Sequence, residues 1–211
     1  MNALILVDIQ NDFLPGGALA VTDGDAIVPV VNALLTDYPL VVATQDWHPP
    51  EHGSFAVNHP GRSVFSQVDL HGLPQTLWPV HCVQWTGGAC FAPGLDTRRI
   101  DRIFPKGTDP RVDSYSGFFD NGHRHATGMA DFLRSRGVTS VSLCGLATDY
   151  CVLHTVLDAC ERGFGTFVLG DAVASVNARS GDGDRARATM EQAGAVFVKL
   201  ADIPAEVAPR G

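Results

Sequence analysis

The segment that decides the fold is Gly145-Leu146-Ala147-Thr148-Asp149-Tyr150-Cys151-Val152. Residues 138–144, directly before it, form an apolar run with the length of a buried strand. After it, apolar residues recur at helical spacing, and Glu161-Arg162-Gly163 then carries a helix stop signal. The quoted segment is therefore predicted to be the turn that joins a buried strand to a helix.

Cys151 lies in this turn at a position that suits a nucleophile. Thr148 is predicted to cap the helix, which makes Cys151 the third helical residue. There the free backbone N–H groups and the positive end of the helix dipole favour a thiolate over a thiol. The alternative is a small buried apolar side chain, as most free cysteines are. The choice depends on whether other residues supply a base and a cation.

Strand-like and helix-like runs alternate along the chain. This alternation predicts an α/β fold: a doubly wound, Rossmann-like, mostly parallel sheet with helices on both faces. We expect a single domain over residues 1–211. The expected strands are residues 3–7, 40–44, 102–106, 138–144, 165–169 and 195–199. The expected helices are residues 25–36, 126–136, the run after Cys151, and 182–192.

The composition excludes several classes of protein. With 45% hydrophobic and 18% charged residues the chain is an ordinary globular one, and its net charge of −8 gives no electrostatic reason to expect nucleic-acid binding. The apolar runs have strand length, so no membrane span is expected. Asp8 interrupts the first run too early for a signal peptide. Five cysteines without a CxxC spacing predict reduced thiols in the cytoplasm.

Residues 47–99 have little periodicity and many Pro, Gly, His and Trp residues. A segment of this length is too long to be a mere connection in a compact domain. We therefore expect a functional loop there.

Three residue types that a cysteine nucleophile requires occur at predicted strand ends. Asp8 ends the first strand, Lys106 ends the third, and Cys151 follows the fourth. Carboxyl ends of parallel strands meet at one edge of the sheet, where ligands bind. Asp8 could accept the thiol proton while Lys106 stabilises the anions. The alternative for Asp8 and Lys106 is an ordinary structural ion pair.

A second group of residues has the composition of a metal site. Asp46 and His48 leave the second strand at i and i+2, so their side chains point to the same side. With His81 they give two imidazoles and a carboxylate with open coordination positions. These ligands suit one divalent ion; we expect zinc first, with iron and manganese as alternatives. His52 is a further candidate ligand, which we expect to lie outside the set or in solvent.

Six motifs in this order resemble those of the nicotinamidase/pyrazinamidase branch of the isochorismatase-like cysteine hydrolases. They cover roughly residues 3–175, and together they are highly specific. The first three are Leu6-Val7-Asp8-Ile9-Gln10-Asn11-Asp12-Phe13, Thr44-Gln45-Asp46-Trp47-His48-Pro49 and Trp78-Pro79-Val80-His81-Cys82-Val83-Gln84. The others are Phe104-Pro105-Lys106-Gly107, Tyr115-Ser116-Gly117-Phe118 and the segment quoted first.

The resemblance implies an isochorismatase-like hydrolase fold with an Asp8–Lys106–Cys151 triad and a metal on Asp46, His48 and His81. It also implies a cis peptide bond between Leu146 and Ala147, with an oxyanion hole formed by the N–H groups of Ala147 and Cys151. Phe13, Trp78 and Tyr115 match the aromatic substrate-binding positions of the family. Trp85 has no counterpart in the pattern, and we expect it to narrow the mouth of the pocket.

The activity that the resemblance implies is hydrolysis of nicotinamide to nicotinate and ammonia in NAD salvage, and of pyrazinamide to pyrazinoate. The first alternative is a related cysteine amidohydrolase that acts on a carbamoyl or ureido compound. Two histidines and a carboxylate also describe non-haem iron oxygenases, although those enzymes usually have a β-barrel scaffold. A third alternative is a binding protein without catalysis. The sequence leaves the oligomeric state open.

Overall fold

The computed structural model describes residues 1–202, and its centre is a six-stranded sheet in which every neighbouring pair of strands is parallel. The strand order is β5-β2-β1-β6-β7-β8. The bounds are β1 Asn2–Val7, β2 Val41–Asp46, β5 Arg102–Lys106, β6 Ser140–Leu146, β7 Gly165–Ala174 and β8 Val196–Val198. The predicted doubly wound sheet is confirmed, and each predicted strand is present. The last residues of the predicted 1–211 domain, 203–211, lie outside the described part.

The strand order has its switch point between β1 and β6. From β1 the chain adds β2 and β5 on one side, then crosses to β6 and adds β7 and β8 on the other. Connections therefore leave β1 and β6 in opposite directions, which opens a crevice beyond their carboxyl ends. Asp8 directly follows β1, and the segment quoted first spans the end of β6 and the turn after it.

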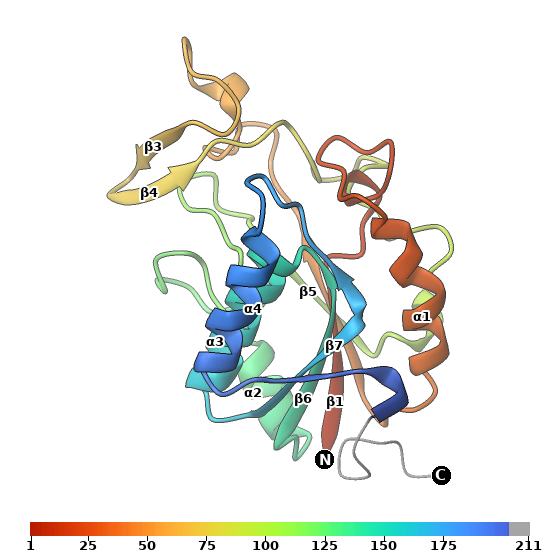
Figure 1. Ribbon diagram of the computed structural model, residues 1–211. Coiled ribbons are helices and arrows are strands. Elements are labelled where there is room, and N and C mark those ends of the chain that lie inside the picture. The colour runs from red at the N-terminus through yellow and green to blue at the C-terminus, as the bar shows by residue number, and fades with distance from the viewer. Residues whose placement is uncertain (203–211) are drawn as a thin grey trace.

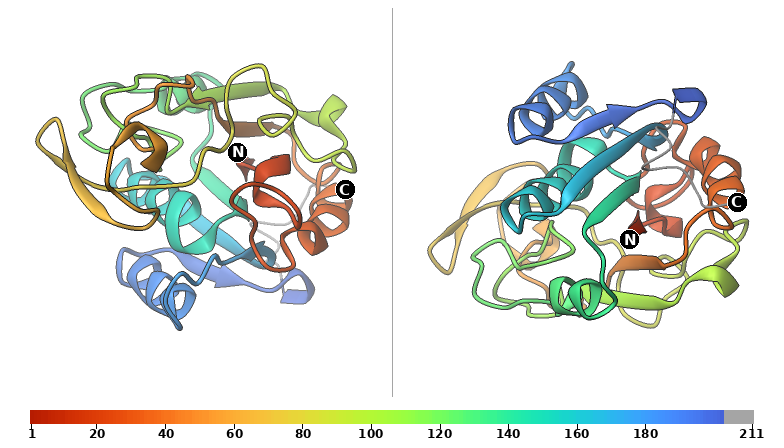
Figure 2. Two further views of the ribbon diagram at one scale, coloured as in Figure 1. Left: turned by 90° about the horizontal axis from the view of Figure 1, so that it is seen from above. Right: turned by 90° about the horizontal axis from the view of Figure 1, so that it is seen from below.

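Helices cover both faces of the sheet. Helix α1 (Ile27–Leu34) lies on one face, and α2 (Met129–Ser135), α3 (Leu153–Glu161) and α4 (Asp182–Gln192) lie on the other (Figures 1 and 2). Strand β1 supplies both layers: Leu4 and Leu6 pack in the core under α1, whereas Ala3 and Ile5 pack under the other helices. Within residues 1–202, no helix has the length and apolar character needed to cross a membrane.

Two predicted helices are shorter than expected. Residues 25–36 contain α1 only from Ile27 to Leu34, because a 3-10 turn at Gly24–Ala26 precedes it. Helix α2 begins at Met129 rather than residue 126. Gly128 before it has a φ of +86°, and the Thr127 hydroxyl accepts the Met129 N–H at 3.2 Å. A left-handed residue ends helical geometry, so α2 cannot extend backward through it.

Residues 47–99 are less irregular than predicted. They contain a hairpin of β3 (Gln67–Leu70) and β4 (Leu73–Thr76), which projects from the carboxyl end of the sheet (Figures 1 and 2). His71 and Gly72 form its two-residue turn with φ values of +52° and +88°. Both values are positive, as the favoured hairpin turn requires. Only four residues form each strand, which is too few for the alternation to stand out in the sequence.

The turn after β6 begins differently from the prediction. The helical segment Thr148–Val152 is a π-helical turn preceded by Ala147, so Thr148 lies inside it and is not the cap. Val152 donates its N–H to the Ala147 oxygen at 3.1 Å, five residues back, which widens the turn. Cys151 is consequently the fourth helical residue, one position further from the helix start than expected. The peptide bond between Leu146 and Ala147 is cis.

Gly145 is required where β6 passes β1. It has a φ of +122°, and a Cβ atom there would lie 2.0 Å from the Val7 oxygen. Gly163 has a φ of +80°, and a Cβ atom added there would have nothing within 4 Å, so it isolates the conformational cost alone. We expect Gly163→Ala to lower the free energy of unfolding by about 1–2 kcal/mol.

Gly145→Ala must additionally push β6 away from β1, and we expect its loss to exceed that of Gly163→Ala by more than about 2 kcal/mol. Urea unfolding of both variants measures the difference. Equal losses for the two variants would show that the two strands separate without cost.

Candidate active site

Four polar side chains meet at the carboxyl ends of four neighbouring strands. Asp8 follows β1, Asp46 and Lys106 are the last residues of β2 and β5, and Cys151 follows β6. The strand register pairs Asp46 directly with Lys106. All four side chains are buried. The sheet order therefore gathers residues that are up to 143 positions apart in the chain, from Asp8 to Cys151.

Lys106 is the centre of this group. Its Nζ lies 2.8 Å from Asp8 Oδ2 and 3.4 Å from Cys151 Sγ. The same ammonium group donates to Asp46 Oδ1 and, at 2.9 Å, to the backbone oxygen of Ser114. One cation thus contacts the candidate base, the candidate nucleophile and the carboxylate of the candidate metal site.

Thr44 fixes the orientation of the Asp8 carboxylate. The Thr44 hydroxyl donates to Asp8 Oδ1 at 2.6 Å and accepts the Asp8 N–H at 3.2 Å. Asp8 has a φ of +47°, which turns its side chain back over the end of the sheet. The other oxygen, Oδ2, is left facing Lys106. The sequence did not mark Thr44 as a site residue, because it reads as one more residue of a buried strand.

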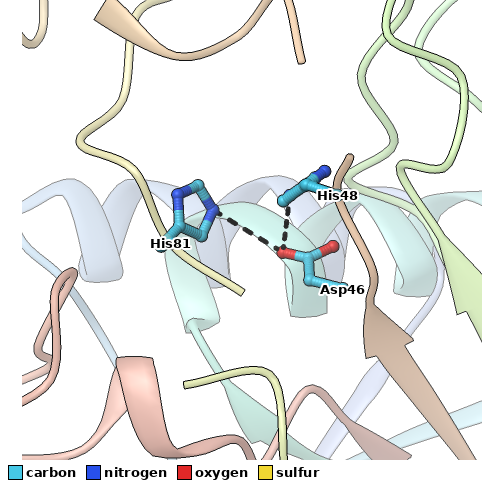
Figure 3. Close-up of side chains that lie close together, drawn as sticks. All are labelled: Asp46, His48 and His81. Atoms are coloured by element: carbon cyan, nitrogen blue, oxygen red, sulfur yellow. Dashed lines mark ion pairs between the residues drawn. The ribbon is translucent and has the colours of Figure 1, made fainter. Parts of the chain in front are cut away.

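Asp46, His48 and His81 form a compact cluster beside Lys106 (Figure 3). The Nε2 atom of His48 lies 3.6 Å from Asp46 Oδ2, and that of His81 lies 3.9 Å from the same oxygen. Asp46 therefore divides its two oxygens, with Oδ1 toward Lys106 and Oδ2 toward the imidazoles.

The other nitrogen of each imidazole is held by a backbone oxygen. His48 Nδ1 lies 2.9 Å from the Gly107 oxygen, and His81 Nδ1 lies 2.8 Å from the Pro79 oxygen. A carbonyl only accepts hydrogen bonds, so each Nδ1 carries the proton and each Nε2 presents a lone pair. Gly107 allows this approach, since a Cβ atom there would lie 2.3 Å from His48 Cε1.

This donor set fits a divalent metal ion. Two ligand atoms about 2.1 Å from one ion lie about 3.4 Å apart in tetrahedral geometry, close to the spacings of the Nε2 atoms from Asp46 Oδ2. Both imidazoles also have the carbonyl partner that usually orients metal-binding histidines. Asp46, His48 and His81 are thus the residues that would hold the ion.

A cavity opens onto both groups. Its wall includes Cys151 and the three members of the metal-type cluster, so a molecule inside could contact both at once. The predicted aromatic residues Phe13, Trp78 and Tyr115 all line it. The complete lining is Phe13, Leu19, Asp46, His48, Trp78, His81, Asp113, Tyr115, Ala147, Tyr150, Cys151 and Val176.

Comparisons with known proteins decide the family. The family model described as the isochorismatase domain matches residues 2–202. The chain belongs to the isochorismatase family. Among its relatives is a nicotinamidase of Escherichia coli (strain K12), 48% identical over 95% of each chain.

Solved structures of similar proteins have the same fold. An Acinetobacter baumanii nicotinamidase/pyrazinamidase has a TM-score of 0.91 and 44% identity, covering 94% of this chain and 95% of that one. A Pyrococcus horikoshii pyrazinamidase in complex with zinc has a TM-score of 0.78 and 39% identity, covering 94% and 99%. This isochorismatase-family chain is therefore similar to nicotinamidases in both sequence and structure.

Two remaining sequence expectations concern His52 and Trp85. His52 is buried rather than in solvent, and its ring lies 4.4 Å from that of His48, outside the cluster around Asp46. Trp85 does not narrow the pocket: it is 87% exposed, packs edge-on against Trp47, and is absent from the cavity lining. Trp85 also has a left-handed φ of +67°.

Two glutamines that support the site were not singled out in the sequence, although Gln10 lies within the first of the quoted motifs. Gln10 holds the backbone of Asp46, accepting its N–H at 2.8 Å and donating to its oxygen at 2.8 Å. Gln75 donates to Asp113 at 2.9 Å and to the Tyr115 hydroxyl at 3.2 Å, where Trp78 also donates at 3.2 Å. Glutamine is a common surface residue, and only the fold reveals that both are buried.

The pKa of Cys151 differs from the expectation of a thiolate. Burial raises the pKa of the thiol well above its ordinary value, and the Lys106 ammonium offsets only part of this effect. Asp8 raises the thiol pKa further through its charge and a hydrogen bond. Burial also raises the pKa of Asp8 itself, against the opposing effect of Lys106. A neutral thiol beside a carboxylate with a raised pKa is a donor and acceptor pair suited to proton transfer.

The effect of Asp8 on the pKa of Cys151 can be tested by substitution. In Asp8→Asn the negative charge that helps to raise the Cys151 pKa is gone, so the thiol pKa should fall. At a pH below both values, each unit of decrease gives about tenfold more thiolate. We therefore expect faster alkylation of Cys151 by iodoacetamide at pH 8, followed by mass spectrometry of its peptide, together with loss of turnover.

The matched control is Asp101→Asn, because Asp101 accepts a backbone N–H (2.8 Å, from Val41) at the opposite end of the sheet. It should leave both rates unchanged. Slower alkylation in Asp8→Asn than in the wild type would mean that Asp8 promotes thiolate formation in the resting protein, contrary to the electrostatic argument.

Proposed function

We propose that this protein is a nicotinamide amidohydrolase, with Cys151 as the nucleophile. The observation that carries the proposal is one cavity, walled by aromatic side chains, onto which the Cys151 thiol and a two-histidine, one-carboxylate cluster both open, with Asp8 buried next to the thiol. A planar pyridine carboxamide has two chemically distinct ends, a ring nitrogen and an amide, that match these two groups. The similarity to nicotinamidases supports the same substrate.

The first half of the reaction makes a thioester. Asp8 accepts the proton of the Cys151 thiol, and Lys106 stabilises the thiolate that forms. The sulfur attacks the amide carbon, and the negative charge moves to the amide oxygen, which the N–H groups of Ala147 and Cys151 stabilise. Protonated Asp8 then gives its proton to the amide nitrogen, the C–N bond breaks, and ammonia leaves.

The second half releases the acid. Asp8, now ionised again, takes a proton from water, and the resulting hydroxide attacks the thioester carbon. The C–S bond breaks, the sulfur recovers a proton from Asp8, and nicotinate is the product. Phe13, Trp78 and Tyr115 hold the ring in the plane that keeps its amide beside Cys151.

Asp46, His48 and His81 would hold one divalent ion, and we propose zinc because their donor set suits it and a similar pyrazinamidase has been solved with zinc. When bound, the ion supplies a Lewis-acidic partner for the ring nitrogen. Metal affinity should weaken at low pH, because Asp46 raises the pKa of His48 and a proton then competes with the metal.

The alternatives are less well supported. Ureido and carbamoyl compounds lack a ring nitrogen that would use the Asp46 cluster. A non-haem oxygenase usually has a β-barrel, whereas this chain has an open parallel sheet. We also propose a place in NAD salvage. We propose a cytoplasmic location as well, since the mechanism requires a reduced thiol and all five cysteines are free.

Ammonia release from nicotinamide tests the proposal directly. We expect turnover of nicotinamide and pyrazinamide, and turnover lower by at least about a hundredfold for ureido and carbamoyl compounds. Cys151→Ala should abolish the reaction while circular dichroism and metal content stay those of the wild type. Substantial turnover by that variant would remove Cys151 from the mechanism, and preference for a ureido compound would replace the proposed substrate.

Benzamide tests whether the Asp46, His48 and His81 cluster positions the ring while Cys151 attacks the amide, because benzamide has the ring shape of nicotinamide but no ring nitrogen. Misplacement of a substrate by about an ångström costs on the order of a hundredfold in rate. Chelation of the metal, or His48→Ala, should therefore reduce kcat/KM far more for nicotinamide than for benzamide. Equal proportional losses, with the fold intact by circular dichroism, would contradict a positioning role.

A further inference from the structure

Val176 is the part of the pocket wall that comes from the segment after β7. Among the described residues that line the cavity, the others come from segments after β1, β2, β5 and β6 and from the residue 78–81 region. Strand β7 pairs with β6 as far as Ala174, which lies opposite Leu146. Beyond Ala174 the chain leaves the sheet, so ladder hydrogen bonds do not position Val176.

The Asp149 carboxylate makes the connection that the sheet does not. Its Oδ1 accepts the N–H of Val176 at 2.9 Å, and its Oδ2 accepts the N–H of Asn177 at 2.8 Å. Asp149 is only 8% exposed. It lies in the same turn as Tyr150 and Cys151, two other residues of the pocket wall. The carboxylate therefore binds the wall segment directly to the turn that carries the nucleophile.

The backbone conformation at Asn177 suits the two hydrogen bonds to the Asp149 carboxylate. Asn177 has a φ of +50°, which lets two consecutive N–H groups face one carboxylate. Hydrogen bonds to a buried ionised acceptor are among the stronger ones in proteins. The Asn177 side chain in turn accepts the Gly183 N–H at 3.0 Å, near the start of α4. The wall segment is thus fixed at the nucleophile turn on one side and at α4 on the other.

We infer that Asp149 is a positioning residue that sets the width of the substrate pocket by holding Val176 against it. The inference rests on the proposed function for the identity of the substrate, but not for the geometry. Asp149 does not touch the reacting atoms, so its loss should relax the wall without removing the base, the nucleophile or the metal ligands. Substrate binding and ring-size selectivity should change more than the chemical step.

Asp149→Asn tests the two hydrogen bonds to the wall segment directly. Its amide can accept only one of the two N–H groups, and its own NH₂ group faces the other, so at least one bond is lost. We expect KM for nicotinamide to rise about tenfold, equivalent to about 1.4 kcal/mol of binding, with kcat within about twofold of the wild type. A merely structural role of Asp149 would lower the melting temperature without this split between KM and kcat.

Val176→Ala is the second variant, and it opens the same wall without touching Asp149. The panel of substrates consists of nicotinamides with a single methyl group, placed in turn at each free ring position. We expect the position whose relative kcat/KM improves most in Val176→Ala to be the one that improves most in Asp149→Asn. The effects of the two substitutions on KM should be less than additive in the double variant, because both relax one contact. Asp101→Asn is again the control at the far end of the sheet.

A readout without substrate separates this inference from the proposed function. Cys151 is alkylated by iodoacetamide and by the bulkier N-ethylmaleimide, and its peptide is quantified by mass spectrometry. Asp149→Asn and Val176→Ala should each raise the rate of Cys151 alkylation by N-ethylmaleimide, relative to that by iodoacetamide, by at least about threefold. Asp101→Asn should leave this ratio unchanged.

The outcomes are separable. If the wild type does not hydrolyse nicotinamide, the proposed function fails, and the alkylation ratios still decide whether Asp149 holds the wall. Unchanged alkylation ratios in Asp149→Asn overturn the inference. So does a loss of kcat with unchanged KM, or a change in selectivity at a different ring position from that of Val176→Ala.

Discussion

The buried ammonium group of Lys106 is the constraint on which the rest of the site depends. Moving one such ion out of water costs several kcal/mol unless partners replace its hydration. Asp8 and Asp46 supply two carboxylates, and the Ser114 oxygen supplies a neutral acceptor. The two carboxylates come from the end of β2 and from the residue after β1, so the ammonium is satisfied only when β5, β2 and β1 lie side by side in the observed register. A shift of one residue between β2 and β5 would turn Asp46 or Lys106 to the opposite face and leave a buried charge unpaired. The chemistry of the site therefore also specifies the pairing of the strands.

Burial is the main reason why the pKa of the Cys151 thiol is raised, and the same group of charges adds to it. Two carboxylates around one ammonium leave an excess of negative charge, and that excess opposes a third anion on Cys151. The helix start, which the sequence suggested as the source of a thiolate, lies one residue further from Cys151 than expected because of the π-helical turn. A protonated thiol next to Asp8 is a coherent starting state. The base has to be available when substrate arrives, and a carboxylate whose pKa burial raises can take the thiol proton more readily than an exposed one.

The polar residues that meet at the carboxyl edge of the sheet could be predicted because each interrupts or ends an apolar run. Asp8, Asp46 and Lys106 are polar residues at the ends of strands that are otherwise buried, and such contrast is visible without any structure. Residues that support them were given no role for the converse reason. Thr44 looks like a strand residue, and Gln10 and Gln75 look like surface residues, although Thr44 and Gln10 lie within quoted motifs. Their roles depend on contacts with segments about 36 to 40 residues away in the chain, for example Gln10 with Asp46. The turn at Thr148–Val152 was wrong in its boundary because a cap prediction assumes an ordinary α-helical start. Trp85 was expected at the mouth of the pocket, whereas in the structure it is exposed and outside the cavity lining.

The polar groups at the edge of the sheet and the residues of the pocket wall are positioned in different ways. Asp8, Asp46 and Lys106 sit on, or directly after, strands of the sheet, where ladder hydrogen bonds fix the backbone, and Cys151 lies in the turn after β6 at the switch point. Most of the pocket wall instead comes from loops, among them the segments of Phe13, Trp78, Tyr115 and Val176, which the sheet does not position. Each such loop needs a local tie, and each observed tie runs to a polar group: Gln75 to Tyr115, and Asp149 to Val176. Variation in these ties would alter the shape of the pocket while leaving Asp8, Lys106 and Cys151 in place. A single family can in this way keep one cysteine chemistry and change the amide on which it acts.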